Sequence, residues 1–434
     1  MLRQKNNVSF LLALLVLLNL MMPLSVMGKE LEGAVYASSG SFFTDDLGED
    51  TGCVQVVYFL SGGIQNRYNR MSYPAFSGNY TLYKPYRYGY RFQGWYTDRA
   101  RHNRINQITT DQTSVYLLYA KWTPLIDNQY NVEHYEYQLK DSGTDGKSIQ
   151  LKNVEYDFWE QIDIPGMPQT KSEDFFKQYI FSESQCPQGI CLTDEFVMIT
   201  SYSPEDACMG ELMIFDRESG EYRVTLGMDE NSHLGGIAFD GENVWVCNSH
   251  EQTIERISFD FIQLMAHQNS GEVVDARDVV DEYKVKNTPS CITYYGERLW
   301  VATHTRMVDS SMVAYHFDSS TEKLTSLSEY KIPSKVQGVA FDESGRVYLS
   351  SSYGRSKSSY LLCYTSVTSL ATRPNHPALR VEMPPCSEEI DISDDTVYIL
   401  FESAGEKYLE GTDGKGTSLS PLDKILMIPV KELS

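Results

Sequence analysis

The second half of this chain repeats one strand–turn–strand phrase, with copies spaced about 50 residues apart. Each copy opens on small or polar residues, passes through a turn and ends in an apolar strand. The aliphatic anchors of the five copies are Ile190, Ile237, Ile292, Val339 and Ile390. Alternation of the strand type at this spacing is typical of a β-propeller, in which each repeat supplies one blade.

Further strand-like segments follow the phrase, such as residues 211–216 and 221–226 after the first copy. Four strands per repeat predict an all-β fold with a five-bladed β-propeller over residues 174–434. After residues 424–430 the last copy has no fourth strand, so we expect residues 175–181 to complete the last blade and close the ring. The alternative is a six-bladed ring whose missing blade comes from residues 135–170.

An apolar dipeptide recurs in the strand after each turn. Its members are Val197/Met198, Val244/Trp245, Leu299/Trp300, Val347/Tyr348 and Val397/Tyr398. Since successive residues of a strand point to opposite faces, we expect each pair to pack between neighbouring blades.

Residues 1–28 have the pattern of a secretory signal. Arg3 and Lys5 precede an apolar stretch over residues 10–24, and small residues follow at 26–28. This stretch of about 15 residues is shorter than the ~20 that a membrane-spanning helix needs. We expect a secreted or surface-exposed protein with no stable membrane span after cleavage; an uncleaved N-terminal anchor is the alternative. Neither a cysteine for lipid attachment nor a C-terminal sorting motif is visible.

A compact segment follows a flexible lead over residues 29–52. Residues 89–98 (Gly-Tyr-Arg-Phe-Gln-Gly-Trp-Tyr-Thr-Asp) precede residues 118–122 (Leu-Tyr-Ala-Lys-Trp), with Gly62 and Gly63 upstream. This pattern resembles the internalin-type B repeat, also called the Listeria–Bacteroides repeat. The resemblance implies a small β-grasp-like domain over residues 53–123, found in bacterial surface and secreted proteins and serving spacing or adhesion. Residues 124–173 are expected to be a linker packed on the propeller.

The polar residues at one end of the repeats are the candidate ligand-binding site. They follow the apolar strands or open the phrases, and a ring would gather them around one mouth of the central channel. The candidates are Gln188, Tyr202, Asn248, His250, Thr303, His304, Gln337, Ser352, Tyr353 and Glu402. Polar and aromatic side chains around a concave mouth suit a glycan or a surface protein of host or bacterium. A solvated funnel without a ligand is the alternative.

Eight cysteines include Cys186 and Cys386, which occupy equivalent positions in the first and last repeats. Neighbouring blades would bring these two close, with a disulfide as one outcome. The net charge of −22 disfavours nucleic acid as a partner. No spacing of ligands indicates a metal or a cofactor.

Catalytic residues are not indicated. A propeller glycosidase needs two carboxylates across a sugar, whereas Glu388, Glu389 and Glu402 all belong to one repeat. The aligned acids Asp194, Asp240, Asp342 and Asp394 lie at turns, where Asp favours local hydrogen bonds. The sequence therefore favours a secreted or surface-exposed binding or adhesion protein. A carbohydrate-active hydrolase or lyase and a structural assembly component are the alternatives.

Overall fold

The computed structural model describes residues 52–433, with gaps at 62, 64, 67, 86, 88–89, 113, 125, 140–147, 163, 165–170, 174–178, 182–184, 204–208, 229–231 and 269–272. The chain divides into two compact units, Met1–Thr123 and Pro124–Ser434. The expected secretory signal at residues 1–28 lies outside the described residues, as does the lead up to residue 51.

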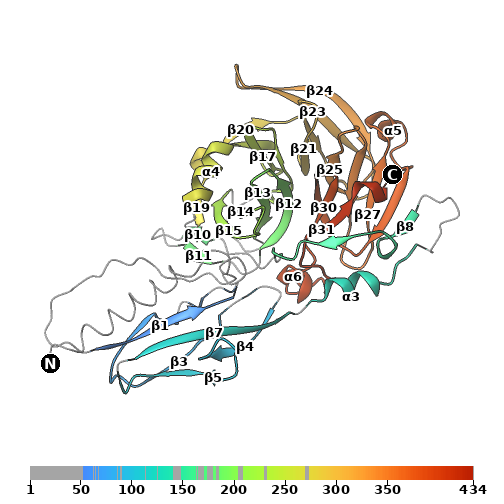
Figure 1. Ribbon diagram of the computed structural model, residues 1–434. Helices are drawn as coiled ribbons and strands as arrows, with labels where there is room; N and C mark the ends of the chain where they lie inside the picture. The colour runs from blue at the N-terminus through green and yellow to red at the C-terminus, as the bar shows by residue number, and fades with distance from the viewer. Residues whose placement is uncertain are drawn as a thin grey trace. The chain divides into compact units, whose positions relative to one another are not determined.

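The first unit is built on a five-stranded sheet (Figure 1). Its strand order is β2 (Ser72–Pro74), β1 (Cys53–Phe59), β7 (Val115–Pro124), β4 (Tyr90–Tyr96) and β5 (Arg104–Ile105). The neighbours β1 and β7 run parallel, and β3 (Asn79–Thr81) pairs separately with β6 (Gln107–Thr109). Burial alternates along β1, as expected for a strand with one face on a core.

Aromatic side chains fill the core of this unit. Trp95 is 2% exposed, and its ring centroid lies 5.1 Å from that of Tyr58 and 5.5 Å from that of Phe92. Phe92 also contacts Trp122, at 5.3 Å between centroids. A domain this small needs such large side chains to bury enough apolar surface.

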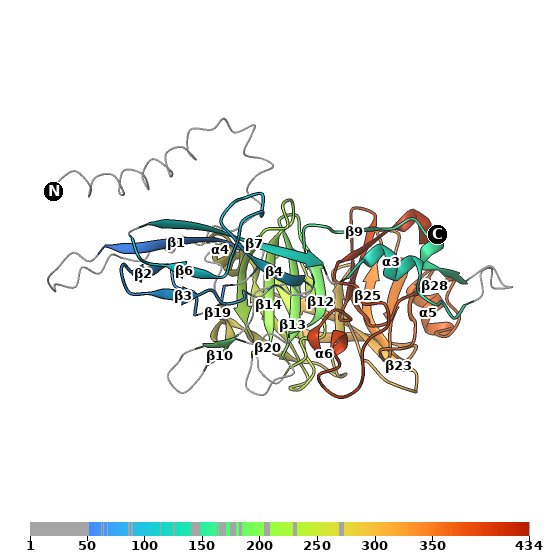
Figure 2. The same cartoon turned by 90° about the horizontal axis from the view of Figure 1, so that it is seen from below.

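The second unit holds five sheets of four or five strands among its described residues (Figure 2). The first sheet is β12 (Cys186–Leu192), β13 (Phe196–Tyr202), β14 (Glu211–Asp216), β15 (Tyr222–Gly227) and β19 (Val273–Asp275). The second is β16 (Ile237–Phe239), β17 (Asn243–Asn248), β18 (Thr253–Ser258) and β20 (Asp281–Lys284). The third is β21 (Cys291–Tyr294), β22 (Leu299–Ala302), β23 (Ser310–Asp318) and β24 (Lys323–Ile332).

The fourth sheet is β25 (Val336–Phe341), β26 (Val347–Ser351), β27 (Ser359–Tyr364), β28 (Leu379–Met383) and β8 (Ser148–Gln150). The fifth is β29 (Ser387–Ser393), β30 (Thr396–Phe401), β31 (Leu426–Pro429) and β9 (Asp157–Phe158). The first strand of each sheet contacts the first strands of the sheets before and after it, and β29 contacts β12. The sheets therefore follow one another around a common axis, which is the architecture of a β-propeller.

Five apolar interfaces join the sheets, and the recurrent dipeptide builds each of them. Met198 packs with Val244 between the first and second sheets, and Val197 packs with Tyr398 between the first and fifth. The pairs Trp245 and Leu299, Trp300 and Val347, and Tyr348 and Val397 share the three remaining interfaces. One member of each dipeptide faces the preceding sheet and the other faces the following sheet, which confirms the predicted packing.

Closure of the fifth sheet differs from the prediction. Its fourth strand is β9, where Leu426 pairs with Phe158 and Met427 with Asp157. Residues 179–181 instead form β11 (Tyr179–Phe181), which pairs with β10 (Lys171–Glu173), while residues 174–178 lie outside the described residues. Residues 157–158 take the place of the expected closing strand because apolar side chains at this point of the sequence become buried between the sheets. Phe158 joins the interface between the fourth and fifth sheets, and Trp159 joins that between the fifth and first.

The expected linker therefore contributes strands to the propeller. Within residues 124–173, β8 extends the fourth sheet, β9 completes the fifth, and β10 pairs only with β11, so the described parts of this range form no further four-stranded sheet. Among the described residues the helices are α3 (Asn128–Glu133), α4 (Phe259–Gln268), α5 (Val367–Thr372) and α6 (Glu406–Leu409). Short 3-10 turns lie at Leu151–Asn153, Arg277–Val279 and Val430–Leu433. In the described part of the chain, no helix combines the length and apolarity that crossing a bilayer requires.

Candidate functional site

The first strands of the sheets begin at the same end of the propeller where the second strands end, and we call this end the mouth. The register of β12, β25 and β29 shifts around Gln188, Gln337 and Glu388 respectively. A β-bulge leaves such a residue outside the ladder and redirects its side chain. Three of the five aligned phrases therefore turn a long polar side chain out of the sheet at the mouth.

These side chains form one hydrogen-bonded chain, the mouth cluster, made of Gln188, Glu402, Glu388 and Gln337. Gln188 Nε2 donates to Glu402 Oε2 over 2.9 Å. Gln337 Nε2 lies 2.9 and 2.8 Å from the two carboxylate oxygens of Glu388. Glu388 and Glu402 are hydrogen-bonded to each other. The mouth cluster therefore links the first sheet to the fifth and the fifth to the fourth.

The two carboxyl groups of the mouth cluster share a proton. Glu388 is 3% exposed, and burial together with the charge of Glu402 raises its pKa well above the ordinary value. Burial also raises the pKa of Glu402, although the charge of Lys407 opposes this shift. A hydrogen bond between two carboxyl groups requires one of them to be protonated, and the pKa of Glu388 is raised well above its ordinary value.

Helix α6 covers the side of the mouth near Tyr202. Lys407 Nζ is hydrogen-bonded to the Tyr202 hydroxyl and lies 4.6 Å from the centroid of the Tyr408 ring. Tyr202 also packs edge-on against His233, at 4.2 Å between ring centroids. Lys407 is 8% exposed, so this part of the mouth is filled by the protein's own side chains.

A buried carboxylate that the sequence analysis did not single out lies on the axis. Glu389 accepts the backbone N–H of Ile237 over 2.7 Å and that of Ile292 over 3.2 Å, so it reaches the second and third sheets from the fifth. Burial raises its pKa. A Cβ at Gly236 would lie 2.9 Å from Glu389 Oε2 and one at Gly338 2.7 Å from Glu389 Cα, so glycine is needed at both. The sequence already distinguished Glu389 from the other repeats, because the residues aligned with it are small: Gly189, Gly236, Cys291 and Gly338.

Four other predicted site residues have local partners. Asn248 is buried and donates to Glu255 Oε1 over 2.7 Å, and the exposed His250 lies 3.1 Å from Glu251 Oε1. Thr303 donates to the Thr288 carbonyl over 2.7 Å. His304 Nδ1 lies 3.2 Å from the Val336 carbonyl, and burial lowers its pKa. His304 also bonds to Gln337 of the mouth cluster.

The anticipated disulfide is not formed. Cys186 and Cys386 are both buried thiols. The thiol of Cys186 is hydrogen-bonded to Lys407 and Tyr202, whereas that of Cys386 lies 3.6 Å from Ser418 Oγ. The two equivalent positions thus face different partners, and burial raises the pKa of both thiols.

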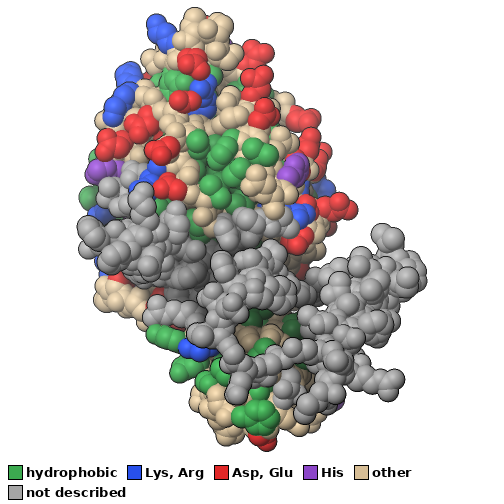
Figure 3. Space-filling model, turned by 90° about the vertical axis from the view of Figure 1, so that its left-hand side faces the viewer, with side chains coloured by type: hydrophobic (Ala, Val, Ile, Leu, Met, Phe, Trp, Pro, Cys, Tyr) green, Lys and Arg blue, Asp and Glu red, His purple; other side chains and the backbone are tan. Residues whose placement is uncertain are grey.

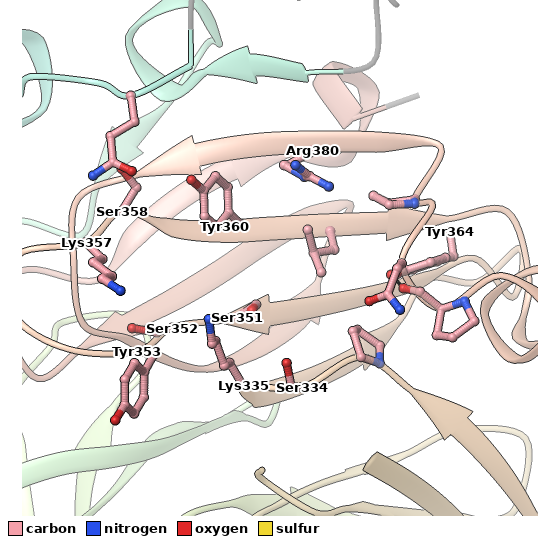
Figure 4. A pocket seen from close by; sticks show the side chains of 16 residues that line it. Ser334, Lys335, Ser351, Ser352, Tyr353, Lys357, Ser358, Tyr360, Tyr364 and Arg380 are labelled. Atoms are coloured by element: carbon pink, nitrogen blue, oxygen red, sulfur yellow. Dashed lines mark hydrogen bonds between the residues drawn. The ribbon is translucent and has the colours of Figure 1, made fainter. Parts of the chain in front are cut away.

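A cleft of about 380 Å³ opens beside the mouth, on the fourth sheet (Figure 4). Its lining residues are Gln138, Pro333, Ser334, Lys335, Ser351, Ser352, Tyr353, Lys357, Ser358, Tyr360, Leu362, Tyr364, Pro374, Asn375, Pro377 and Arg380. Leu362 and Tyr364 belong to the interface with the third sheet, so the cleft lies on the face turned toward that sheet. Of the ten predicted site residues, Ser352 and Tyr353 line it.

The carboxyl pair does not have the geometry of a glycosidase. Such enzymes hold two carboxyl groups about 5–10 Å apart, on either side of the scissile bond. Glu388 lies on β29, Glu402 directly follows the paired strand β30, and the two carboxyl groups are hydrogen-bonded to each other, so no sugar fits between them. The mouth cluster closes the ring, whereas the cleft offers space to a ligand.

No protein-family model matches the chain, and no curated protein does. Among solved structures, a chain of the nidogen/laminin complex aligns at 13% identity over 54% of this chain and 83% of its own, with a TM-score of 0.33. The glutaminyl cyclase of Myxococcus xanthus aligns at 8% identity over 57% and 93%, with a TM-score of 0.34. YCF48 bound to D1 peptide aligns at 11% identity over 58% and 66%, with a TM-score of 0.29. These likenesses carry no argument about function.

Proposed function

We propose that this chain is an exported bacterial binding protein whose five-bladed β-propeller recognises a glycan. The cleft on the fourth sheet is the observation that carries the proposal. It is concave, it extends along the fourth sheet from the mouth end, and it combines three tyrosines with several hydroxyl and amide groups. Ligand sites of this size are usually built from apolar and aromatic surface with a few polar groups that fix orientation.

Five blades are proposed from the number of sheets and interfaces among the described residues. Each of the five aligned phrases supplies the first two strands of one sheet, and the interface between the fifth and first sheets closes the cycle. The side chains of the mouth cluster reinforce the closure across three sheets. A ring closed in this way leaves the cleft on a rigid support, as recognition requires.

Export and surface presentation are proposed from the N-terminal part of the sequence. Residues 1–28 carry the pattern of a secretory signal, and residues 53–123 resemble an internalin-type B repeat. Their sheet with a buried Trp95 suits a small module of this kind. In this reading the module spaces or anchors the propeller, and the propeller carries the recognition.

Glycan binding by the full chain tests the proposal. The protein is applied to an immobilised panel of bacterial and host glycans beside the variants Tyr353→Ala and Tyr360→Ala. Loss of an aromatic contact surface is expected to weaken retention roughly tenfold or more. Tyr294→Ala is the matched control, since Tyr294 is 37% exposed, close to the 41% of Tyr353, but lies outside the cleft.

Retention that depends on both tyrosines of the cleft but not on Tyr294 supports the proposal. Failure of the wild-type chain to retain any glycan refutes it and favours the assembly component. Release of shortened glycan products during incubation would instead favour the carbohydrate-active enzyme.

A further inference from the structure

The cleft carries positive charge in a strongly acidic protein. The chain has 37 basic and 59 acidic residues, and Figure 3 shows acidic side chains spread over the described surface of one face. Lys335, Lys357 and Arg380 nevertheless all line the cleft, and no Asp or Glu is among its described lining residues. Such a local reversal of charge attracts an anion against the field of the whole molecule.

The three cations form no ion pair with any described carboxylate, in contrast to other basic residues of the propeller. Arg355, for example, contacts Asp413 at 2.6 Å, and Arg256 contacts Asp281 at 2.5 Å. The three cations of the cleft come from separate segments: Lys335 precedes β25, Lys357 precedes β27, and Arg380 lies on β28. Figure 4 shows all three around the space over β26 and β27.

The backbone at Lys335 resembles that of one other repeat, but its side chain is particular to the fourth sheet. Lys335 has a φ of 66°, and Cys386, which holds the same place before β29, has a φ of 68°. A positive φ thus occurs at two of the five aligned positions, in the turns into β25 and β29. Cys386 is 3% exposed, whereas Lys335 is only half-buried. The N–H of Lys335 donates to Thr305 O over 2.7 Å, and its carbonyl accepts the N–H of Ser352 over 2.9 Å. The fold thus fixes a lysine at the edge of the cleft.

Aromatic rings accompany the cations. Lys335 Nζ lies 5.7 Å from the ring centroid of Tyr353, and the guanidinium of Arg380 lies 5.6 Å from that of Tyr360. The rings present apolar faces on which the C–H groups of a sugar ring can pack, while the cations can pair with an acidic substituent. Ser334, Ser351 and Asn375 supply hydroxyl and amide groups for sugar hydroxyls.

One carboxylate lies beneath this surface without neutralising it. Glu382 pairs with Tyr360 across β27 and β28, but it is 0% exposed. It accepts the backbone N–H of Gln138 over 2.6 Å and that of Leu139 over 2.7 Å, and the hydroxyl of Ser358 also donates to it. The cleft therefore has three cations at its surface and one buried carboxylate beneath it, whose oxygens already accept hydrogen bonds from other groups.

We infer that the cleft binds a carboxylate-bearing sugar, such as a uronate or sialate unit of an acidic polysaccharide. The inference rests on the proposed glycan-binding function and specifies its ligand class. The sugar ring packs on Tyr353 and Tyr360, and its carboxylate pairs with Arg380 and the two lysines. A planar guanidinium is suited to such a carboxylate because it can donate two parallel hydrogen bonds.

Calorimetric titration of the full chain tests this inference. The probes are tetragalacturonate, its methyl ester, a hyaluronan tetrasaccharide, disialic acid and sulfated dextran. The methyl ester keeps the shape of tetragalacturonate and removes its charge. At least one carboxylated probe is expected to bind, with affinity that falls as salt rises. Arg380→Gln and Lys335→Gln are expected to weaken this binding roughly tenfold each.

Lys323→Gln is the matched control, because Lys323 is an exposed lysine of β24 outside the cleft. If Arg380→Gln does not fold, the exposed Lys357→Gln replaces it. Equal binding of the methyl ester, or preference for sulfated dextran, overturns the carboxylate assignment. If neutral glycans bind through the cleft tyrosines with no effect of Arg380→Gln, glycan recognition stands and the acidic ligand class falls. If no glycan binds at all, the proposed function itself is wrong.

Discussion

The mouth cluster and the cleft on the fourth sheet are both polar, and they differ in whether their groups already have partners. The mouth cluster is buried, and its amides and carboxyl groups bond to one another across three sheets. The cleft on the fourth sheet is open, and its three cations have no described carboxylate as a partner. Polar groups that satisfy one another hold a structure together. Polar groups left to solvent on a rigid surface can bind a ligand.

This comparison changes the meaning of the sequence pattern. Polar residues at one end of the repeats suggested a recognition surface, but Gln188, Gln337 and Glu402 bond within the mouth cluster instead. The cleft combines Lys335 and Tyr353, which flank the fourth repeated phrase, with Tyr360 on β27 and Arg380 on β28, where that phrase has ended.

The largest expected effect concerns the carboxylate on the axis. Glu389→Ala leaves the N–H groups of Ile237 and Ile292 without an acceptor and opens a cavity between three sheets. We expect a loss of about 3 kcal/mol in the free energy of unfolding of the propeller. Urea denaturation followed by tryptophan fluorescence measures it, with Glu389→Gln as the milder control that keeps one acceptor oxygen. A loss below about 1 kcal/mol would show that Glu389 does not join the sheets.

A second effect depends on pH. The unfolded chain loses the proton of Glu388 near the ordinary value of about 4.3, whereas the folded chain keeps it to a higher pH. Between the two values the folded state binds more protons, so the free energy of unfolding falls as pH rises. Glu388→Gln cannot ionise and can still donate to Glu402. It should therefore flatten this fall and be more stable than the wild type at pH 8, by about 1 kcal/mol or more.

Unfolding free energies at pH 5 and pH 8 check this prediction, and Glu382→Gln serves as a control outside the mouth cluster. Parallel pH profiles of the wild type and Glu388→Gln would mean that Glu388 is ionised in the folded protein at pH 5, contrary to the shared proton.

Sequence reasoning reached the fold through the strand–turn–strand phrase repeated about every 50 residues, and the apolar dipeptide in each phrase predicted the packing because both faces of its strand are buried between neighbouring sheets. It missed the closing strand, since β9 has only two residues and is recognisable by the burial of Phe158 rather than by alternation. Glu389 stood in the aligned phrases, but only the close approach of Gly236 and Gly338 reveals that its side chain fills the axis. The cleft joins Lys335, Lys357 and Arg380, which are separated along the chain, so no local pattern could predict it.

The smallest expected change in unfolding free energy is that of Arg380→Gln, and comparing this variant with Gln337→Ala tests the account most directly. Arg380→Gln and Gln337→Ala are compared for unfolding free energy and for binding of the carboxylated oligosaccharide. Arg380→Gln should weaken binding roughly tenfold and change stability by less than about 0.5 kcal/mol. Gln337→Ala should leave binding unchanged and lower stability by about 1 kcal/mol, because Glu388 loses its amide donor. The opposite outcome, with binding lost in Gln337→Ala and intact in Arg380→Gln, would place recognition at the mouth cluster and contradict the account.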